Sequence, residues 1–182
     1  MPYLARIASS DMLLNIKRTL AELKRKVTHK PHVMDVFLHL SDPYSFLLIQ
    51  VLPDIASRYN VPIELHIINS VNEEMFPEQK MWVNNALTDA LRLAKLYNLA
   101  MPKTPPNHKQ EDYNYIVNQL IESESLPNAL TIFNTAFNQY WFNKISSHQD
   151  AGLNDINEEP LNIKALSQNE ALLKRLGHYM GG

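Results

Sequence analysis

The sequence predicts an α/β protein in which one helix precedes a β-α-β unit and a block of helices follows it. Apolar residues recur at helical spacing near the start of the chain. Two short apolar segments, rich in β-branched residues, then enclose a segment long enough for a helix. From about residue 76 the apolar period is helical again. Only four of the 182 residues are glycine, three of them in the last six, so we expect a helix-rich body with few tight turns.

The first expected helix covers residues 10–27 and carries a narrow apolar stripe. Ser10 or Asp11 can serve as its N-cap. The stripe consists of Leu13, Ile16, Leu20, Leu23 and Val27. Leaving these side chains in water would forgo about 1.5–3 kcal/mol each, so we expect the stripe to be buried, either on the chain's own domain or across the seam of a homodimer.

The β-α-β unit is expected over residues 33–68. Residues 33–40 and 61–68 have strand composition, and Ser41-Asp42-Pro43 marks a turn between the first strand and a helix. Pro43 suits the first turn of that helix, because its missing N–H costs nothing there. A helical crossover of about twenty residues is long enough to make the two strands parallel neighbours.

Helices are expected around residues 86–94 and 116–121, and another from Pro127. Ser167 and Glu170 form a capping-box pattern for a last helix that Gly177 would end. Glu122 and Glu124 are two residues apart, hence on different helix faces, and are expected to be solvated.

Composition excludes several functions. With no cysteine, the chain has no thiol nucleophile, redox pair, disulfide or cysteine-built metal centre, and so few glycines exclude a P-loop and a dinucleotide-binding turn. The net charge of −2 and the absence of a basic stripe argue against nucleic-acid binding. No apolar run is long enough to span a membrane and the start lacks a signal-peptide core, so we expect a cytoplasmic protein.

The run Phe37–Leu47 (FLHLSDPYSFL) directly after a strand resembles the start of the first helix in the DsbA-like branch of the thioredoxin superfamily. It is most similar to kappa-class glutathione transferases and 2-hydroxychromene-2-carboxylate isomerases, which carry an S-P-[YF]-S-[YW]-L pattern there. Residues 86–102, 129–150 and 173–182 resemble later segments of that family in the same order, so the resemblance covers residues 33–182.

The resemblance implies a thioredoxin-like organisation. Residues 1–31 would be an N-terminal helical extension, 32–70 the β-α-β unit, 71–176 a large all-helical insertion, and 177–182 the approach to a cis-proline loop. The family's C-terminal β-hairpin and final helix have no counterpart in this chain. We therefore expect the natural polypeptide to continue beyond Gly182, and the sheet to need another covering element.

In the family, the residue before the motif proline is a serine, or a cysteine in the disulfide-forming relatives, that meets the sulfur of glutathione. An ungapped alignment places Asp42 there. Its carboxylate would repel a thiolate and, as an N-cap, would occupy the amides of the first turn. A one-residue insertion would instead give the role to Ser41, with Asp42 turned to solvent.

The resemblance thus implies Ser41 as the catalytic residue and Asp42, Pro43, Tyr44 and Ser45 as substrate-binding residues, with glutathione as cofactor. The alternative for the same residues is a well-capped helix start, with Tyr44 as a packing aromatic. His39 and His66 are expected near the carboxyl ends of adjacent strands, but two imidazoles without a third ligand predict no metal site.

Two functions follow from the resemblance. One is a glutathione-dependent transferase or isomerase without thiol redox activity, whose partners are a small-molecule thiol and an electrophile. The other is a non-catalytic thioredoxin-fold interaction module that has lost the sulfur site.

Overall fold

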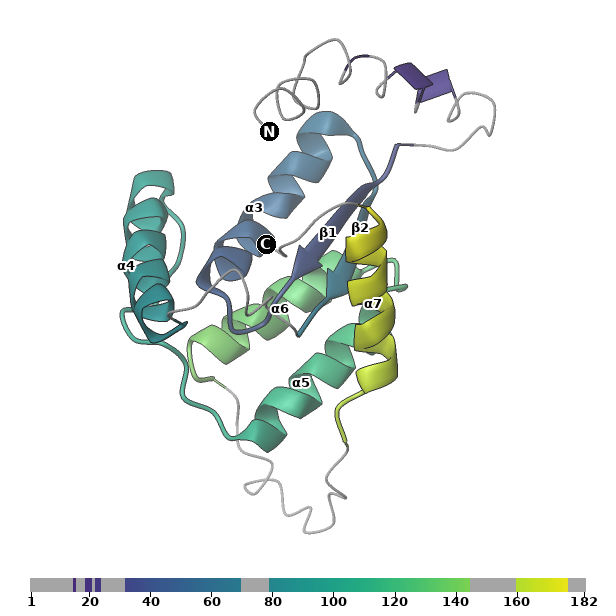
Figure 1. Ribbon diagram of the computed structural model, residues 1–182. Helices are drawn as coiled ribbons and strands as arrows, with labels where there is room; N and C mark the ends of the chain where they lie inside the picture. The colour runs from purple at the N-terminus through teal and green to yellow at the C-terminus, as the bar shows by residue number, and fades with distance from the viewer. Residues whose placement is uncertain are drawn as a thin grey trace, which may run out of the picture. The chain divides into compact units, whose positions relative to one another are not determined.

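The computed structural model describes residues 32–69, 79–144 and 160–176, with isolated positions among residues 15–23; for residues 79–84 it describes the backbone alone. The chain divides into two compact units, Met1–Val33 and Met34–Gly182. The elements of the second unit are β1 (Met34–Leu38), α3 (Pro43–Tyr59), β2 (Ile63–Ile67), α4 (Gln79–Tyr97), α5 (Gln110–Ser123), α6 (Ala129–Trp141) and α7 (Ile163–Arg175), as Figure 1 shows.

The predicted β-α-β arrangement is confirmed. β1 and β2 are parallel neighbours, paired from Met34 with Ile63 to Leu38 with Ile67, and α3 connects them. Pro43 is the first residue of α3, as expected from its fixed φ and missing donor. The helix ends at Tyr59, and its C-cap Asn60 has a φ of 49°, in the left-handed region that asparagine tolerates better than most residues.

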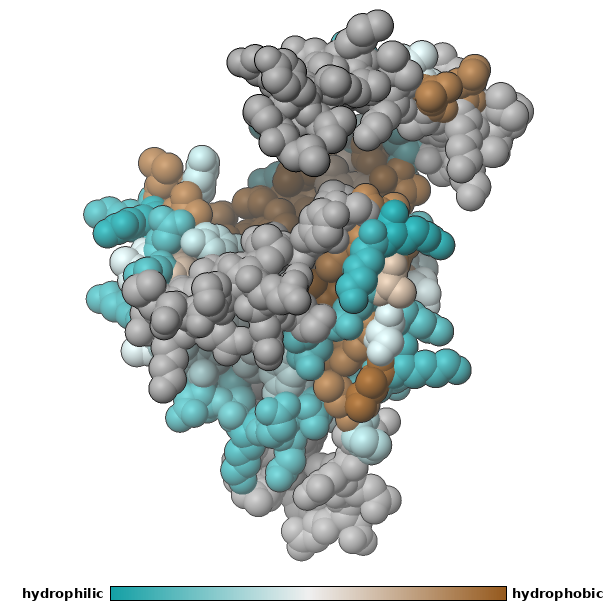
Figure 2. Space-filling view, viewed as in Figure 1, coloured by the Kyte–Doolittle hydropathy of each residue, from teal (hydrophilic) through white to brown (hydrophobic). Residues whose placement is uncertain are grey.

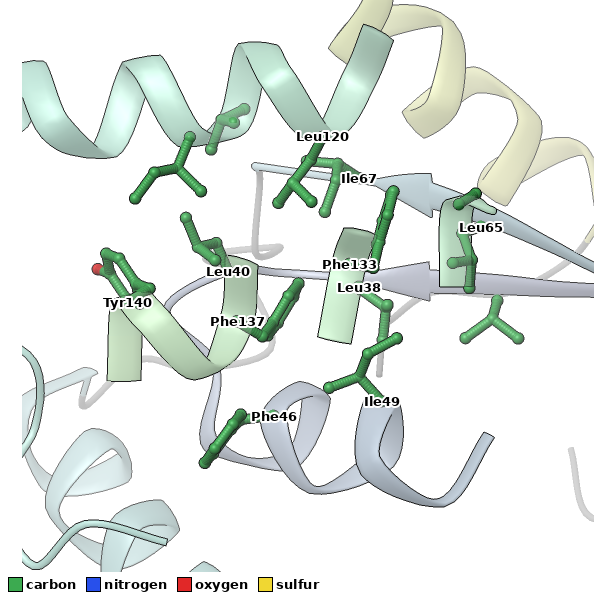
Figure 3. Packing of buried hydrophobic residues seen from close by; sticks show 14 of the residues in the cluster. Leu38, Leu40, Phe46, Ile49, Leu65, Ile67, Leu120, Phe133, Phe137 and Tyr140 are labelled. Carbon is green, nitrogen blue, oxygen red and sulfur yellow. The ribbon is translucent and has the colours of Figure 1, made fainter. Parts of the chain in front are cut away.

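One face of the sheet carries the main hydrophobic core. Side chains alternate along each strand, which places Val36 and Leu38 of β1 beside Leu65 and Ile67 of β2. These four pack with buried residues of α3, α5 and α6, several of which Figure 3 shows in contact. The helices supply mainly Phe46, Ile49, Leu52, Ile116, Val117, Leu120, Phe133, Phe137, Tyr140 and Trp141.

Helix α7 covers the outer edge of β2. Leu166 belongs to the main core, whereas Leu173, two turns later, packs with Phe37 and Ile68 on the other face of the sheet. Asn169 lies between them and is buried. The outward side of α7 is a mixture of hydrophilic and apolar residues (Figure 2). The covering element that a two-stranded sheet needs at this edge is therefore part of the chain itself.

One expectation about a helix is wrong. The last helix begins at Ile163, not at the Ser167–Glu170 pattern, because the side chain of Asn162 accepts a hydrogen bond from the Ala165 amide (3.1 Å) and caps the helix earlier. The expected burial of the apolar stripe is not decided by the single chain, in which Leu20 and Leu23 are 60% and 59% exposed. A homodimer seam stays a prediction.

The other stripe residues (Leu13, Ile16 and Val27) and residues 177–182 lie outside the described part of the chain. Among the described residues, no helix is both long and apolar enough to cross a membrane.

Candidate functional site

A cluster of polar side chains lies where the carboxyl end of the sheet meets the start of α3. It contains His39 and Ser41 from the loop after β1, and Asp42 and Ser45 at the start of α3. Asn69, which follows β2, and two tyrosines from α5 and α6 complete it. In open α/β sheets, ligands bind at this edge of the strands.

Asp42 is the N-cap of α3. Its Oδ2 accepts hydrogen bonds from the amide of Ser45 (2.7 Å) and from the Ser45 hydroxyl (2.9 Å). Its Oδ1 is buried and has no partner among the described residues. Burial raises the pKa of the Asp42 carboxyl, and the hydrogen bonds from Ser45 oppose that rise.

Ser45 links the cap to the strand end. Its side chain is fully buried, and its hydroxyl donates to Asp42 while accepting from the amide of His39 (3.1 Å). The Ser45 hydroxyl thus pairs both with the backbone amide of His39, just beyond β1, and with one of the two oxygens of the Asp42 carboxylate. This explains why a serine lies at the third position of the helix.

His39 contributes a partly buried imidazole to this cluster. Its Nδ1 accepts a hydrogen bond from the amide of Ser41 (3.2 Å), so this nitrogen carries no proton. Burial lowers the pKa of His39, while the charge of Asp42 and a hydrogen bond with the Asn69 backbone act in the opposite direction. The neutral ring therefore holds the loop that carries Ser41.

Ser41 points toward the end of α6. Its Oγ lies 2.7 Å from the hydroxyl of Tyr140, and Figure 3 shows Tyr140 at the end of the core, beside Leu40. The backbone carbonyl of Tyr140 lies 2.7 Å from Nε2 of His108, and the two rings are 4.8 Å apart. Loop and helix contacts therefore fix the position of the Tyr140 ring.

Tyr113 of α5 extends the cluster to the end of β2. Its hydroxyl donates to Oδ1 of Asn69 (2.6 Å), and its ring meets that of Tyr140 edge to face at 6.1 Å. Burial raises the pKa of both phenols, while the bond with Ser41 opposes the rise at Tyr140. Both hydroxyls are therefore protonated at neutral pH.

The residues proposed from the sequence divide into two groups. Ser41, Asp42 and Ser45 lie together, with Pro43 buried as the first helical residue. Tyr44 points elsewhere, because its hydroxyl donates to Oδ2 of Asp89 in α4 (3.0 Å). The expectation that Asp42 turns to solvent is wrong, since its carboxylate is largely buried as a cap.

Three members of the cluster escaped the sequence analysis. Asn69 and Tyr113 belong to no recognisable motif, and Tyr140 lies within the helix expected from Pro127, for which the sequence analysis proposes no site residue. The only sequence signal for Tyr140 was a hydroxyl-bearing residue at the end of an otherwise apolar face of that helix.

A second polar contact lies at the outer edge of β2. Glu124 accepts a hydrogen bond from the Ile67 amide (2.8 Å) and another from Asn169, whose Nδ2 also donates to the Ile67 carbonyl (2.8 Å). Burial raises the pKa of Glu124. The expectation that Glu124 is solvated is therefore wrong. The contact pairs the outward-facing amide and carbonyl of Ile67 at the strand edge.

Comparison with known proteins leaves the geometry as the guide to function. No family model matches the chain. Among curated proteins, too, the search found no match of significance.

Proposed function

We propose that this chain is a thioredoxin-like, glutathione-dependent transferase or isomerase whose sulfur site lies at Ser41. The observation that carries the proposal is the pair of hydroxyls, Ser41 Oγ and Tyr140 OH, 2.7 Å apart beside the start of α3. Within such a pair only one O–H bond is used, so the receiving hydroxyl keeps its own proton to donate to a third group. A thiolate is a suitable acceptor.

The proposed reaction begins with the thiolate of glutathione held by that free O–H and by the positive end of the α3 dipole. The sulfur lone pair forms a bond to an electrophilic carbon. In a transfer, the leaving group departs with its bonding electrons. In an isomerisation, the electrons move into the substrate, a bond rotates, and the carbon–sulfur bond breaks to return the thiolate.

Asp42 sets the pH dependence of the proposed binding. An ionised carboxylate beside a thiolate costs about 1–4 kcal/mol at a separation of roughly 4 Å. Burial raises the pKa of Asp42, so at a given pH a larger fraction of this carboxyl is neutral than in water, and the repulsion is reduced by that fraction.

The position of the motif in a β-α-β unit that resembles the thioredoxin type supports the proposal. The motif Ser41–Ser45 covers the end of the loop after β1 and the first three residues of α3, where the family binds glutathione. The absence of cysteine restricts the chemistry to sulfur supplied by the ligand.

The second candidate is a non-catalytic interaction module. One observation favours it: Oδ2 of Asp42 already occupies the amide of Ser45 at the start of α3. Because the Ser45 amide is already used, the N-terminus of α3 has one fewer backbone donor for an anion. The rest of the cluster would then serve only to hold the loop after β1 in its conformation.

Titration of the complete protein with reduced glutathione by calorimetry separates the two. We expect Kd in the millimolar range or tighter, and a loss of about fivefold in affinity for Ser41→Ala and for Tyr140→Phe, since each removes one hydrogen bond. Asp42→Asn keeps the capping oxygen and removes the charge, so it is expected to strengthen binding by at least about fivefold.

Matched controls are Ser57→Ala, Tyr97→Phe and Asp54→Asn, whose side chains are exposed on α3 and α4. They are expected to bind as the wild type does. No binding by the complete protein at millimolar glutathione rejects the enzyme and leaves the interaction module. Binding that Ser41→Ala and Tyr140→Phe leave unchanged places the thiol elsewhere and also rejects the proposed site.

A further inference from the structure

The second face of the sheet carries three side chains that are common metal ligands. Asp35 pairs with Glu64 in the register of β1 and β2, and His66 pairs with Phe37. Because side chains alternate along strands, these residues share the face opposite the main core. They lie outside the cluster at Ser41.

The donor atoms of Asp35, Glu64 and His66 all lie within 4.8 Å of one another. Nε2 of His66 is 3.1 Å from Oδ1 of Asp35. Two ligands at about 2.1 Å from a zinc ion are separated by about 3.0 Å at a right angle and about 3.4 Å at the tetrahedral angle. His66 and Asp35 therefore already have the spacing of two ligands.

Glu64 can supply the third ligand by a movement of its side chain. Two ligands at the tetrahedral angle are about 3.4 Å apart, so a pair at the 4.8 Å limit must close by about 1.4 Å. The side chain of Glu64 is exposed, and its rotatable bonds permit this closure. The strands themselves need not move.

His66 is held in place before any ion binds. Its ring stacks on Phe37, with 4.8 Å between centroids and 25° between planes, and its side chain is only 13% exposed. Phe37 is in turn packed against Leu173 of α7. A ligand whose rotamer is fixed by packing loses little entropy on binding a metal.

The charges around His66 favour a cation. Asp35 and Glu64 lie directly opposite each other on neighbouring strands, an arrangement that destabilises a sheet. The charge of Glu124 also acts on His66 from the edge of β2. In the described ranges, the ion pair of Asp35 is with His66, and no lysine or arginine there pairs with either strand carboxylate.

We propose that Asp35, Glu64 and His66 form a binding site for one divalent transition-metal ion of the Zn²⁺ type. Two carboxylate oxygens and an imidazole nitrogen are ligands that Zn²⁺ accepts, whereas Mg²⁺ and Ca²⁺ prefer oxygen alone. The sequence analysis predicted no metal site because it paired His66 with His39. The structure places His66 beside two carboxylates instead.

The test is calorimetric titration of the metal-free protein with ZnCl₂, and with MgCl₂ for comparison. We expect one Zn²⁺ per chain with micromolar Kd, and binding of Mg²⁺ at least about a hundredfold weaker. His66→Ala, Asp35→Asn and Glu64→Gln should each weaken Zn²⁺ binding at least about tenfold, since each removes one of three ligands. Bound Zn²⁺ should also raise the Tm of the wild type.

His32→Ala and Glu122→Gln are the matched controls, because both residues are exposed and lie outside the trio. They should leave the affinity for Zn²⁺ unchanged. If His66→Ala fails to fold, the test rests on Asp35→Asn and Glu64→Gln, because these two variants change exposed side chains. No Zn²⁺ binding at or below millimolar concentration, or binding that the trio variants and the controls weaken equally, overturns the proposal.

Discussion

At the scale of single residues, His39 and Asp42 are partly buried neighbours, and burial favours the neutral form of both. Burial lowers the pKa of the imidazole from its ordinary 6.5 and raises that of the carboxyl from 3.8. The hydrogen bond that Nδ1 of His39 accepts from the Ser41 amide requires the neutral ring. Protonation of this nitrogen would break that bond.

His39 is therefore expected to make stability depend on pH. Because its folded pKa is lowered, its contribution is fully present above 6.5 and is lost as pH falls through the folded pKa. The raised pKa values of Asp42 and Glu124 act oppositely: their contribution is present below 3.8 and 4.5 and is lost as pH rises. The contribution of His39 to the pH dependence of stability must therefore be separated from those of the carboxyls by a substitution at His39 alone.

Urea unfolding of the wild type and His39→Gln, each measured from pH 7.5 to 5, provides that comparison. The wild type should lose up to about 1.4 kcal/mol per pH unit relative to His39→Gln below pH 6.5. The glutamine oxygen can accept from the Ser41 amide but does not titrate. The exposed His32→Gln should follow the wild type. Parallel profiles for the wild type and His39→Gln would contradict this expectation.

At the scale of elements, the contact between α7 and the outer edge of β2 stabilises the short sheet. A strand edge has unpaired donors and acceptors, which normally invite pairing with another chain. Here Glu124 takes the Ile67 amide and Asn169 takes the Ile67 carbonyl. Leu166 and Leu173 then attach α7 to both faces of the sheet.

Asn169→Ala is expected to lower the free energy of unfolding by about 1–3 kcal/mol, because it leaves the Ile67 carbonyl and Glu124 without that donor. Hydrogen exchange at the Ile67 amide should accelerate more than exchange elsewhere in β2. Gln168→Ala, at an exposed position of the same helix, should change stability by less than about 0.5 kcal/mol. Equal effects of the two substitutions would show that the contact adds nothing.

The same contacts show which features sequence patterns can predict. Short-range patterns predicted the two strands, α3 and the cap at Asp42, because each of these depends on residues that are close together in the sequence. Glu124 binds a strand 57 residues away. The two-residue spacing between Glu122 and Glu124 indicates only that they lie on different helix faces. It carries no information about a distant partner of Glu124. Asn69 and Tyr113 likewise meet across 44 residues.

At the scale of the whole molecule, Trp141 joins the loop after β1 to two helices. It is almost fully buried, it stacks on Phe46 of α3 at 5.3 Å, and its Nε1 donates to the carbonyl of Leu40 (3.0 Å). Leu40 directly precedes Ser41, so the same side chain that fills the core also fixes the start of the candidate site. Core packing and site geometry are thus coupled through one residue.

Trp141→Phe should therefore affect stability and binding together. The substitution leaves the Leu40 carbonyl without its donor and opens a cavity beside Phe46, so unfolding free energy should fall by about 2–4 kcal/mol in urea titrations followed by circular dichroism. Tyr59→Phe, at a position 63% exposed, should change it by less than about 0.5 kcal/mol. Glutathione affinity of the folded Trp141→Phe protein should also fall, because the Leu40–Ser41 segment loses the bond that fixes it. A large loss of stability with unchanged affinity would show that the loop keeps its position without Trp141, and that the core and the site are independent.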